Sequence, residues 1–404
     1  MSFPESEYHE RWERVWKAMQ RRGYEWLLIW QRGAGAYDRV GDVYWLTHFI
    51  MNGSGQDPAS EEFGAPYTFS AVLIRQGREP ELHLGLPEGE IDLSGVVCGR
   101  IVSHPENLMH GLARYLAGAG IEGRVGLIGD DLLPGMYDRQ LRRATPQIEW
   151  CSDETLLLEP QRIKSAAELE VYRRAGALVT EAMTALVTAL RAGESSAEAG
   201  ARAASILVRS GGGYHRIDVH HGSDAERTVV SQNLYGYDTV APSRGELARA
   251  WIFGPILEGY WMDPGRTVTC GAEPTAVQRR LLEGTVEVVE GVMRAMRPGV
   301  TPRQLGVLAE QLARRHGYFE HPQLRVPLGH GLSTNFIPYM IPMGPGEPDP
   351  SGTLGYDLPL EAGMVMASEL FLTHPGVGTA GFEQNMIVTA DGCELLTRTP
   401  MLLG

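Results

Sequence analysis

Cysteine is scarce in this sequence of 404 residues, which contains four, at positions 98, 151, 270 and 393. They lie far apart, form no C-x-x-C pair and are too few for a disulfide framework in a chain of this length. The first residues also lack the basic and then apolar plan of an export signal. We therefore expect a protein of the reducing cytoplasm.

Positively charged residues are outnumbered by acidic ones, and long apolar runs are missing. The chain has 36 Lys and Arg against 50 Asp and Glu, a net charge of −14, and no long basic run of the kind that follows phosphates, which argues against nucleic acid as a partner. No stretch of about 18 residues is uninterruptedly apolar, so no membrane span is expected. The 43% hydrophobic content nevertheless suffices for a sizeable core, in two or three domains by length.

The first part of the chain alternates short β-rich runs, at 26–30, 69–74 and 124–128, with helical patterns. This alternation predicts a layered α/β domain over residues 1–158. Gly33 and Gly35 follow the first run, but Asp38 stands where the third glycine of a G-x-G-x-x-G motif would be. A loop is therefore a better interpretation than a dinucleotide site.

A second domain is predicted over residues 159–404, with an α+β pattern. Ser165 and Glu168 have the spacing of a capping box and open a long amphipathic stretch. Two later segments then share one plan: a helix, a glycine turn, a capping box and a second helix. This repetition predicts a duplicated unit about a pseudo-twofold axis. The glycines and box residues are Gly193, Ser195 and Glu198 in the first copy and Gly299, Thr301 and Gln304 in the second.

Extended chain surrounds the second copy. Residues 249–269 predict a β-hairpin that turns at 257–259, and the tail from 364 onward predicts further strands. Four polar residues lie in these apolar or glycine-rich contexts: Asp263, His330, Glu369 and Glu383. Buried carboxylates are costly unless they are paired or bind a metal, and three acids with one imidazole suit Mn, Fe(II), Zn or Co. Each residue alone is more simply a satisfied polar side chain or a surface strand end.

The same residues lie in a longer series of motifs, at 162–175, 259–267, 329–331, 360–369 and 383–397. With these motifs, residues 161–399 resemble the pita-bread family of creatinase, prolidase, aminopeptidase P and methionine aminopeptidase. The resemblance implies a C-terminal pita-bread domain after a creatinase-type N-terminal domain, and a homodimer. It also implies two aspartates, one histidine and two glutamates around two metals. Four of these five fall on Asp263, His330, Glu369 and Glu383.

The first family aspartate is missing. In the family it lies 11 residues before the second, which is position 252, and the sequence has Ile252 there. A hydrocarbon side chain cannot bind a cation. The resemblance assigns the histidine and both glutamates, with the second aspartate, to the other metal. We therefore predict at most one divalent metal, held by Asp263, His330, Glu369 and Glu383.

The usual proton-transfer histidine is missing too. In the peptidases and creatinase it lies about seven residues after the ligand histidine, where this sequence has Ile337, and the nearby Asn335 cannot titrate. Creatinase also uses a histidine in a loop upstream of the missing aspartate. Here that histidine is His220 or His221, or Tyr235 and Tyr237 occupy the loop instead. Arg266 matches the family arginine that follows the second aspartate. The candidate catalytic residues are His220, His221, His330 and Glu369, and the candidate substrate-binding residues are Tyr235, Tyr237, Tyr260, Trp261, Arg266 and Asn335.

These observations predict a hydrolase that acts on a C–N bond of a small polar, amino-acid-derived substrate with one metal. Ordinary Xaa-Pro peptidase activity is not expected, because the family peptidases bridge the nucleophile between two metals. Three alternatives stay open. They are a metal-independent creatinase-like amidinohydrolase, a metal-assisted lyase and a non-catalytic binding protein. For the metal-free case, Tyr260 and Trp261 would add cation–π contacts to an anionic pocket.

Overall fold

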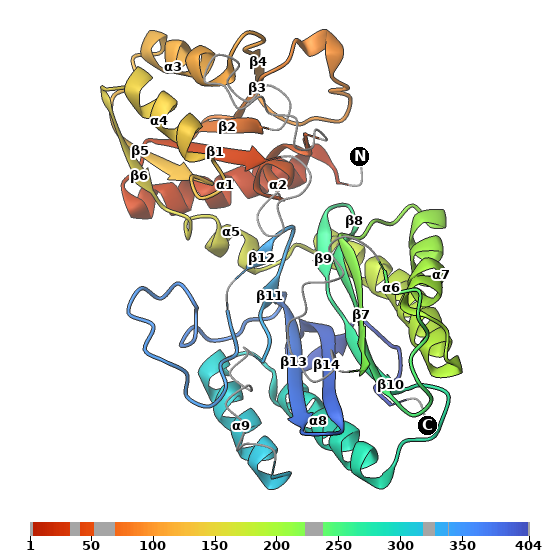
Figure 1. Cartoon of the computed structure of the whole chain (residues 1–404). Coiled ribbons are helices and arrows are strands. Elements are labelled where there is room, and N and C mark those ends of the chain that lie inside the picture. Colours follow the sequence, from red (N-terminus) through yellow and green to blue (C-terminus); the bar gives the residue numbers. More distant parts are fainter. Residues whose placement is uncertain are drawn as a thin grey trace. The chain divides into compact units, whose positions relative to one another are not determined.

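The chain divides into two compact units, Met1–Gln161 and Arg162–Gly404. The computed structural model describes residues 3–32, 41–51, 69–222, 237–317, 328–337 and 339–402, and Figure 1 shows the arrangement within each unit.

The N-terminal unit is built on a sheet with the strand order β4-β3-β2-β1-β5-β6. Strand β1 runs antiparallel to β2 and parallel to β5. Helices α3 and α4 lie together on one side of this sheet and α1 on the other (Figure 1). The strands are β1 (Trp26–Arg32), β2 (Phe69–Arg75), β3 (Glu81–Leu84), β4 (Arg100–Ser103), β5 (Gly123–Ile128) and β6 (Ile148–Ser152). The helices are α1 (Glu5–Arg22), α2 (Gly41–Thr47), η1 (Glu88–Glu90), α3 (Leu108–Gly118), α4 (Gly135–Ala144) and α5 (Leu158–Arg162), which ends at the start of the next unit.

Both faces of the central strands are covered in this unit. Residues 27–30 of β1 have no exposed surface, which is the pattern of a strand between two helical layers. Helix α1 buries a stripe at helical spacing, with Tyr8, Trp12, Val15 and Met19 inside, and ends at Gly23, whose φ of 74° suits the left-handed cap.

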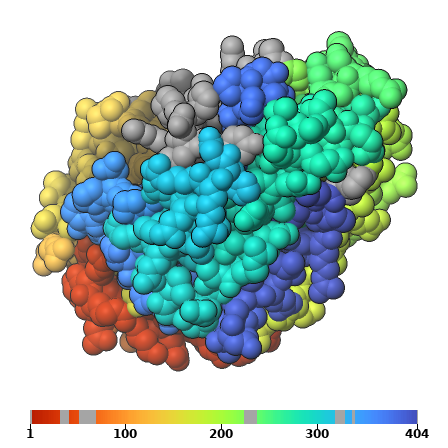
Figure 2. Space-filling view, turned by 90° about the horizontal axis from the view of Figure 1, so that it is seen from below, coloured from red at the N-terminus to blue at the C-terminus, as the bar shows by residue number. Residues whose placement is uncertain are grey.

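The C-terminal unit has a larger sheet with the order β12-β11-β13-β14-β10-β8-β7, while β15 pairs with β14 and β9 with β8. Its strands are β7 (Arg216–His221), β8 (Leu247–Leu257), β9 (Tyr260–Met262), β10 (Gly265–Thr269), β11 (Gly331–Leu332), β12 (Phe336–Ile337), β13 (Val365–His374), β14 (Gly378–Val388) and β15 (Cys393–Leu395). Its helices are α6 (Ala166–Ala192), α7 (Ser196–Arg209), α8 (Ala276–Ala295) and α9 (Pro302–Arg315). Helices α8 and α9 form much of the surface in Figure 2.

The helices repeat one capping scheme. Each of the four begins with a capping box in which a hydroxyl and a Glu or Gln side chain exchange hydrogen bonds with main-chain N–H groups. The pairs α6–α7 and α8–α9 thus start alike, as the repeated plan in the sequence predicts. The box at Thr275, which opens α8, is the one that sequence analysis missed.

The predicted hairpin is present but interrupted. Strands β8 and β9 turn at Glu258 and Gly259, which have φ values of 49° and 75°, as a tight hairpin turn requires. The chain then leaves the ladder at Asp263 and resumes as β10. This break places a carboxylate at the middle of the sheet.

Helix α6 is a long, apolar helix. It has 27 residues and an 18-residue window of mean hydropathy 1.2, so by length and composition it is able to cross a membrane. Half of that window is buried, and α6 packs against α7 and β8. Those are the surroundings of a core helix.

Candidate metal centre

Four strand segments bring the predicted polar residues together. Glu369 in β13 lies directly opposite Glu383 in β14, and Glu383 in turn lies opposite Gly265, two residues after Asp263. His330 immediately precedes β11, and its carbonyl accepts the N–H of Ala367 in β13. Residues that are far apart along the chain therefore converge on one part of the sheet.

Three of these side chains have converging ligand atoms. The Nε2 atom of His330 lies 3.1 Å from Oδ2 of Asp263 and 3.6 Å from Oε1 of Glu383. One ligand atom from each of the three lies within 4.8 Å of the others. Asp263 and Glu383 are each 1% exposed and His330 is 7% exposed. Glu369 is partly exposed and is not part of this group.

Neighbouring polar groups fix the two buried carboxylates. Asn385 clamps Asp263, because its amide donates to Oδ1 at 2.6 Å while its own oxygen accepts the Asp263 main-chain N–H at 3.0 Å. The indole Nε1 of Trp251 donates to Oε2 of Glu383 at 2.7 Å. Oε1 of Glu383 is buried without a hydrogen-bond partner among the described residues. A buried oxygen of this kind, beside an imidazole and a second carboxylate, fits a divalent cation.

Arg266 binds main-chain carbonyls of neighbouring segments rather than the carboxylates of the candidate metal centre. Its guanidinium donates to the main-chain carbonyls of Gly265, Glu383 and Thr399 at 2.6 to 2.8 Å and to the side chain of Gln384 at 3.2 Å. Burial lowers the pKa of Arg266 to about 10, although the charge of Glu383 acts against this. These bonds fix the part of β14 that carries Glu383.

The charges of the group are strongly coupled. Burial opposes the charge of His330, but the attraction of the carboxylates of Asp263 and then Glu383 outweighs it and raises the pKa of His330 well above the ordinary value. Burial raises the pKa of Glu369 to about 8 despite the opposing charge of His330, and Asp263 adds to the rise. Burial, then Asp263 and Glu369, raises the pKa of Glu383 well above its usual range. At neutral pH the side chains alone thus hold extra protons, which a divalent cation would displace.

A buried arginine lies on the same face of the sheet. Arg249 in β8 has no exposed surface, and its guanidinium carbon lies 5.3 Å from the ring centre of Phe371 in β13. Burial lowers its pKa to about 10, while the negative charges of Glu369 and Asp218 oppose that shift. Arg249 therefore adds positive charge beside the acidic group.

The two predicted upstream histidines differ in their surroundings. His220 is 8% exposed and lies opposite Arg249. Burial, reinforced by the charge of Arg249, lowers its pKa to about 4. His221 lies 3.3 Å from Asp238 and 3.6 Å from Glu246. His220 is thus the inward residue and is neutral at pH 7.

The predicted substrate-binding residues are dispersed. Tyr260 has no exposed surface and its hydroxyl donates to Glu168, so its ring offers no face to a substrate. Trp261 is 2% exposed. Asn335 is 3% exposed and lies in the turn between β11 and β12. Tyr237 is 41% exposed and lies against Gly200 of α7. Tyr235 and the side chain of Ile337 lie outside the described residues.

Sequence reasoning missed Trp251, Asn385 and Arg249. A signal was available, since side chains alternate along a strand. Asn385 follows Glu383 by two residues, and Arg249 precedes Trp251 by two. What the sequence does not contain is the register that sets β8 beside β10 and β10 beside β14.

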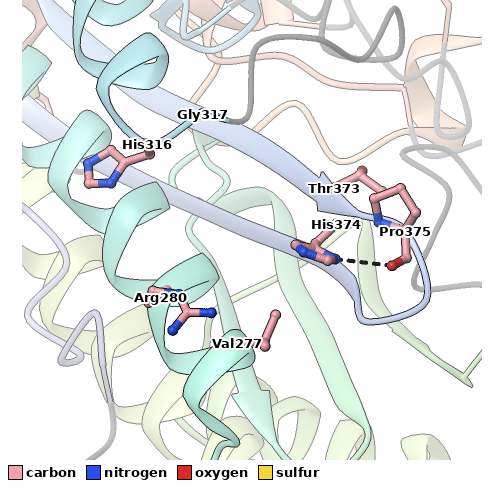
Figure 3. Close-up of a pocket in the computed structure, with 7 residues that line it drawn as sticks. All are labelled: Val277, Arg280, His316, Gly317, Thr373, His374 and Pro375. Carbon is pink, nitrogen blue, oxygen red and sulfur yellow. Dashed lines mark hydrogen bonds between the residues drawn. The ribbon is translucent and has the colours of Figure 1, made fainter.

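A separate hollow of about 330 Å³ lies at the end of β13, next to α8 and α9. Figure 3 shows its side chains, which include Arg280, His316 and His374. Asp263, His330 and Glu383 are not among the residues that line this hollow. It is therefore distinct from the candidate metal centre.

Known proteins match both the sequence and the fold. Residues 170–390 match the metallopeptidase family M24. The chain belongs to this family. It is accordingly a hydrolase of a metallopeptidase family, and the predicted relationship to the creatinase, prolidase and aminopeptidase P family is confirmed. An Xaa-Pro dipeptidase of Lactobacillus helveticus is 28% identical over 274 residues, which is 67% of this chain and 69% of that protein.

Solved structures of two peptidases share the architecture. The Xaa-Pro dipeptidase from Bacillus anthracis has a TM-score of 0.73 at 19% identity and covers 98% of this chain and 99% of its own. A prolidase from Thermococcus sibiricus has a TM-score of 0.76 at 17% identity, with 97% of each chain covered. The predicted α+β fold with a pita-bread domain is thereby confirmed.

Proposed function

We propose that this chain is a dipeptidase-like hydrolase that cleaves a C–N bond in a small polar, amino-acid-derived substrate with one divalent metal. Asp263, His330 and Glu383 would hold the metal. The observation that carries the proposal is the convergence of their three ligand atoms within 4.8 Å, with Oε1 of Glu383 left without a hydrogen-bond partner there. Mn, Fe(II), Zn or Co suits this set of two oxygens and one nitrogen.

Glu369 is better suited to carry a proton than to bind the metal. It lies opposite Glu383 but outside the group of converging atoms. In the metal-free protein burial raises its pKa to about 8, and an upward shift of a carboxyl pKa suits an acid–base catalyst near neutral pH. Because Glu369 is partly exposed, a substrate is able to approach it. We infer that Glu369 gives a proton to the leaving nitrogen.

The remaining residues keep the centre in place. When bound, the metal would polarise the substrate carbonyl and lower the pKa of a water to about 7. Asn385 holds Asp263 from two directions. Arg266 anchors the main chain at Glu383. Support of this kind around metal ligands is worth about 10- to 100-fold in metal affinity or activity.

Relatives named as dipeptidases support a dipeptide-sized substrate. We do not extend the proposed substrate to proline after the scissile bond, because a one-metal centre lacks the second cation. A panel of Xaa-Pro and other dipeptides, tested with metal restored after chelation, separates these cases. We expect hydrolysis of a non-proline dipeptide that Asp263→Asn abolishes and that Glu7→Gln, which alters a buried acid in α1 of the N-terminal unit, retains. Equal hydrolysis by both variants would refute the proposal.

A second candidate is a metal-independent, creatinase-like amidinohydrolase. The observation in its favour is the ion pair of His330 with Asp263 and Glu383, since an imidazolium already offsets part of the acidic charge. This function predicts hydrolysis of a small guanidino acid that continues in excess chelator. Activity that disappears with chelator and returns with metal would exclude it.

A further inference from the structure

Trp251 lies in a row that crosses three strands of the C-terminal sheet. It pairs with Gly265 in β10, and Gly265 pairs with Glu383 in β14. Side chains alternate along a regular strand, so Trp251 shares the face of Glu383 while Ile252 points to the other face. The residue that β8 presents to the candidate metal centre is thus Trp251 and not Ile252.

The indole is held in one position by close packing. A Cβ atom on Gly265 would lie 2.0 Å from the ring, and one on Gly381 would lie 2.5 Å from it, so only glycine leaves room at either place. Phe371 in β13 stacks on the indole ring of Trp251, with ring centres 4.9 Å apart and planes 20° apart. Trp251 is 3% exposed. Its N–H therefore has a fixed direction.

Because the N–H of Trp251 has a fixed direction, the two carboxylate oxygens of Glu383 have different neighbours. Oε2 accepts the indole N–H at 2.7 Å, while Oε1 lies 3.6 Å from His330 in the ligand group. A two-metal centre clamps its substrate between ions about 3.5 to 4 Å apart, and a carboxylate shared by both ions has to offer both oxygens. Here one oxygen is already engaged.

We propose that Trp251 takes the place of a second cation beside Glu383. Its N–H binds Oε2, its ring fills the adjacent space, and Oε1 is thereby turned toward a single metal. Trp251 acts as a positioning residue, because it works through Glu383. The proposal rests on the proposed one-metal function and predicts that an aspartate at position 252 alone does not create a second site.

The first test is Trp251→Phe, which keeps an aromatic ring and removes the N–H. Titration calorimetry with Mn²⁺ alone, on protein stripped of metal, measures affinity and stoichiometry. We expect about 10- to 100-fold weaker binding and one site per chain. The matched control is Trp150→Phe, which also loses a buried indole hydrogen bond, to Thr145 in the N-terminal unit. The control should bind Mn²⁺ as the unaltered protein does.

The second test compares aspartate at two adjacent positions. Trp251→Asp places a carboxylate on the face of Glu383 and should raise the metal count toward two per chain, whereas Ile252→Asp should leave it at one. If Trp251→Asp does not fold, Trp251→Phe still decides. Unchanged Mn²⁺ affinity in Trp251→Phe, or two ions in Ile252→Asp, would overturn the role of Trp251. An unaltered protein that binds no ion or two ions would instead refute the one-metal function.

Discussion

Replacement of Glu369 by glutamine should stabilise the metal-free protein, and the gain should grow with pH. Burial raises the pKa of Glu369 to about 8 from the ordinary value of 4.5. A raised acid pKa gives stability that is complete below the unfolded value and is lost as pH rises through the folded value. At about 1.36 kcal/mol per pH unit, the loss reaches at most about 5 kcal/mol by pH 8. Glutamine has almost the same shape and does not ionise.

Solvent reduces this ceiling because Glu369 is partly exposed and Arg249 and His330 favour its charge. We therefore expect Glu369→Gln to gain about 1–2 kcal/mol at pH 8 and almost nothing at pH 4.5. Urea unfolding in excess chelator, at several pH values, measures the difference. Glu181→Gln, at an exposed position of α6, is the control and should give a small, pH-independent change. A constant difference for Glu369→Gln, or a loss that grows with pH, would refute the electrostatic reasoning.

Three further substitutions test the supporting contacts. Asn385→Ala removes both hydrogen bonds to Asp263 and should weaken Mn²⁺ binding about 10- to 100-fold in titration calorimetry; unchanged affinity would contradict this. Gly265→Ala would place a methyl group 2.0 Å from the ring of Trp251 and should cost about 1–3 kcal/mol in urea unfolding, so a neutral result would show that the ring is free to move. Arg266→Lys keeps the charge but loses the fork to several carbonyls, and should cost about 2–4 kcal/mol.

The sequence predicts local features of the fold better than the contacts of the site. Local signals such as the capping boxes at Ser165, Ser195 and Thr301 identified three helix starts, because the two halves of each box lie three residues apart. Glycine at 259 identified the hairpin turn for the same reason. These features depend on neighbours in the chain.

The site depends on contacts across the sheet. Asp263 and Asn385, or Trp251 and Glu383, are more than 100 residues apart, and no local pattern links them. The resemblance supplied the four polar positions but directed attention to Ile252, since it compares residues position by position. Strand alternation and register show instead that Trp251 contacts Glu383, which a linear motif cannot express.

The metal count per chain tests the central claim most directly. Protein purified without chelators and loaded with excess Mn²⁺, then freed of unbound metal, should contain about one ion per chain by elemental analysis. His330→Ala should contain close to none, since His330 supplies the nitrogen of the ligand group. Two ions per chain, or one ion retained in His330→Ala, would contradict the account.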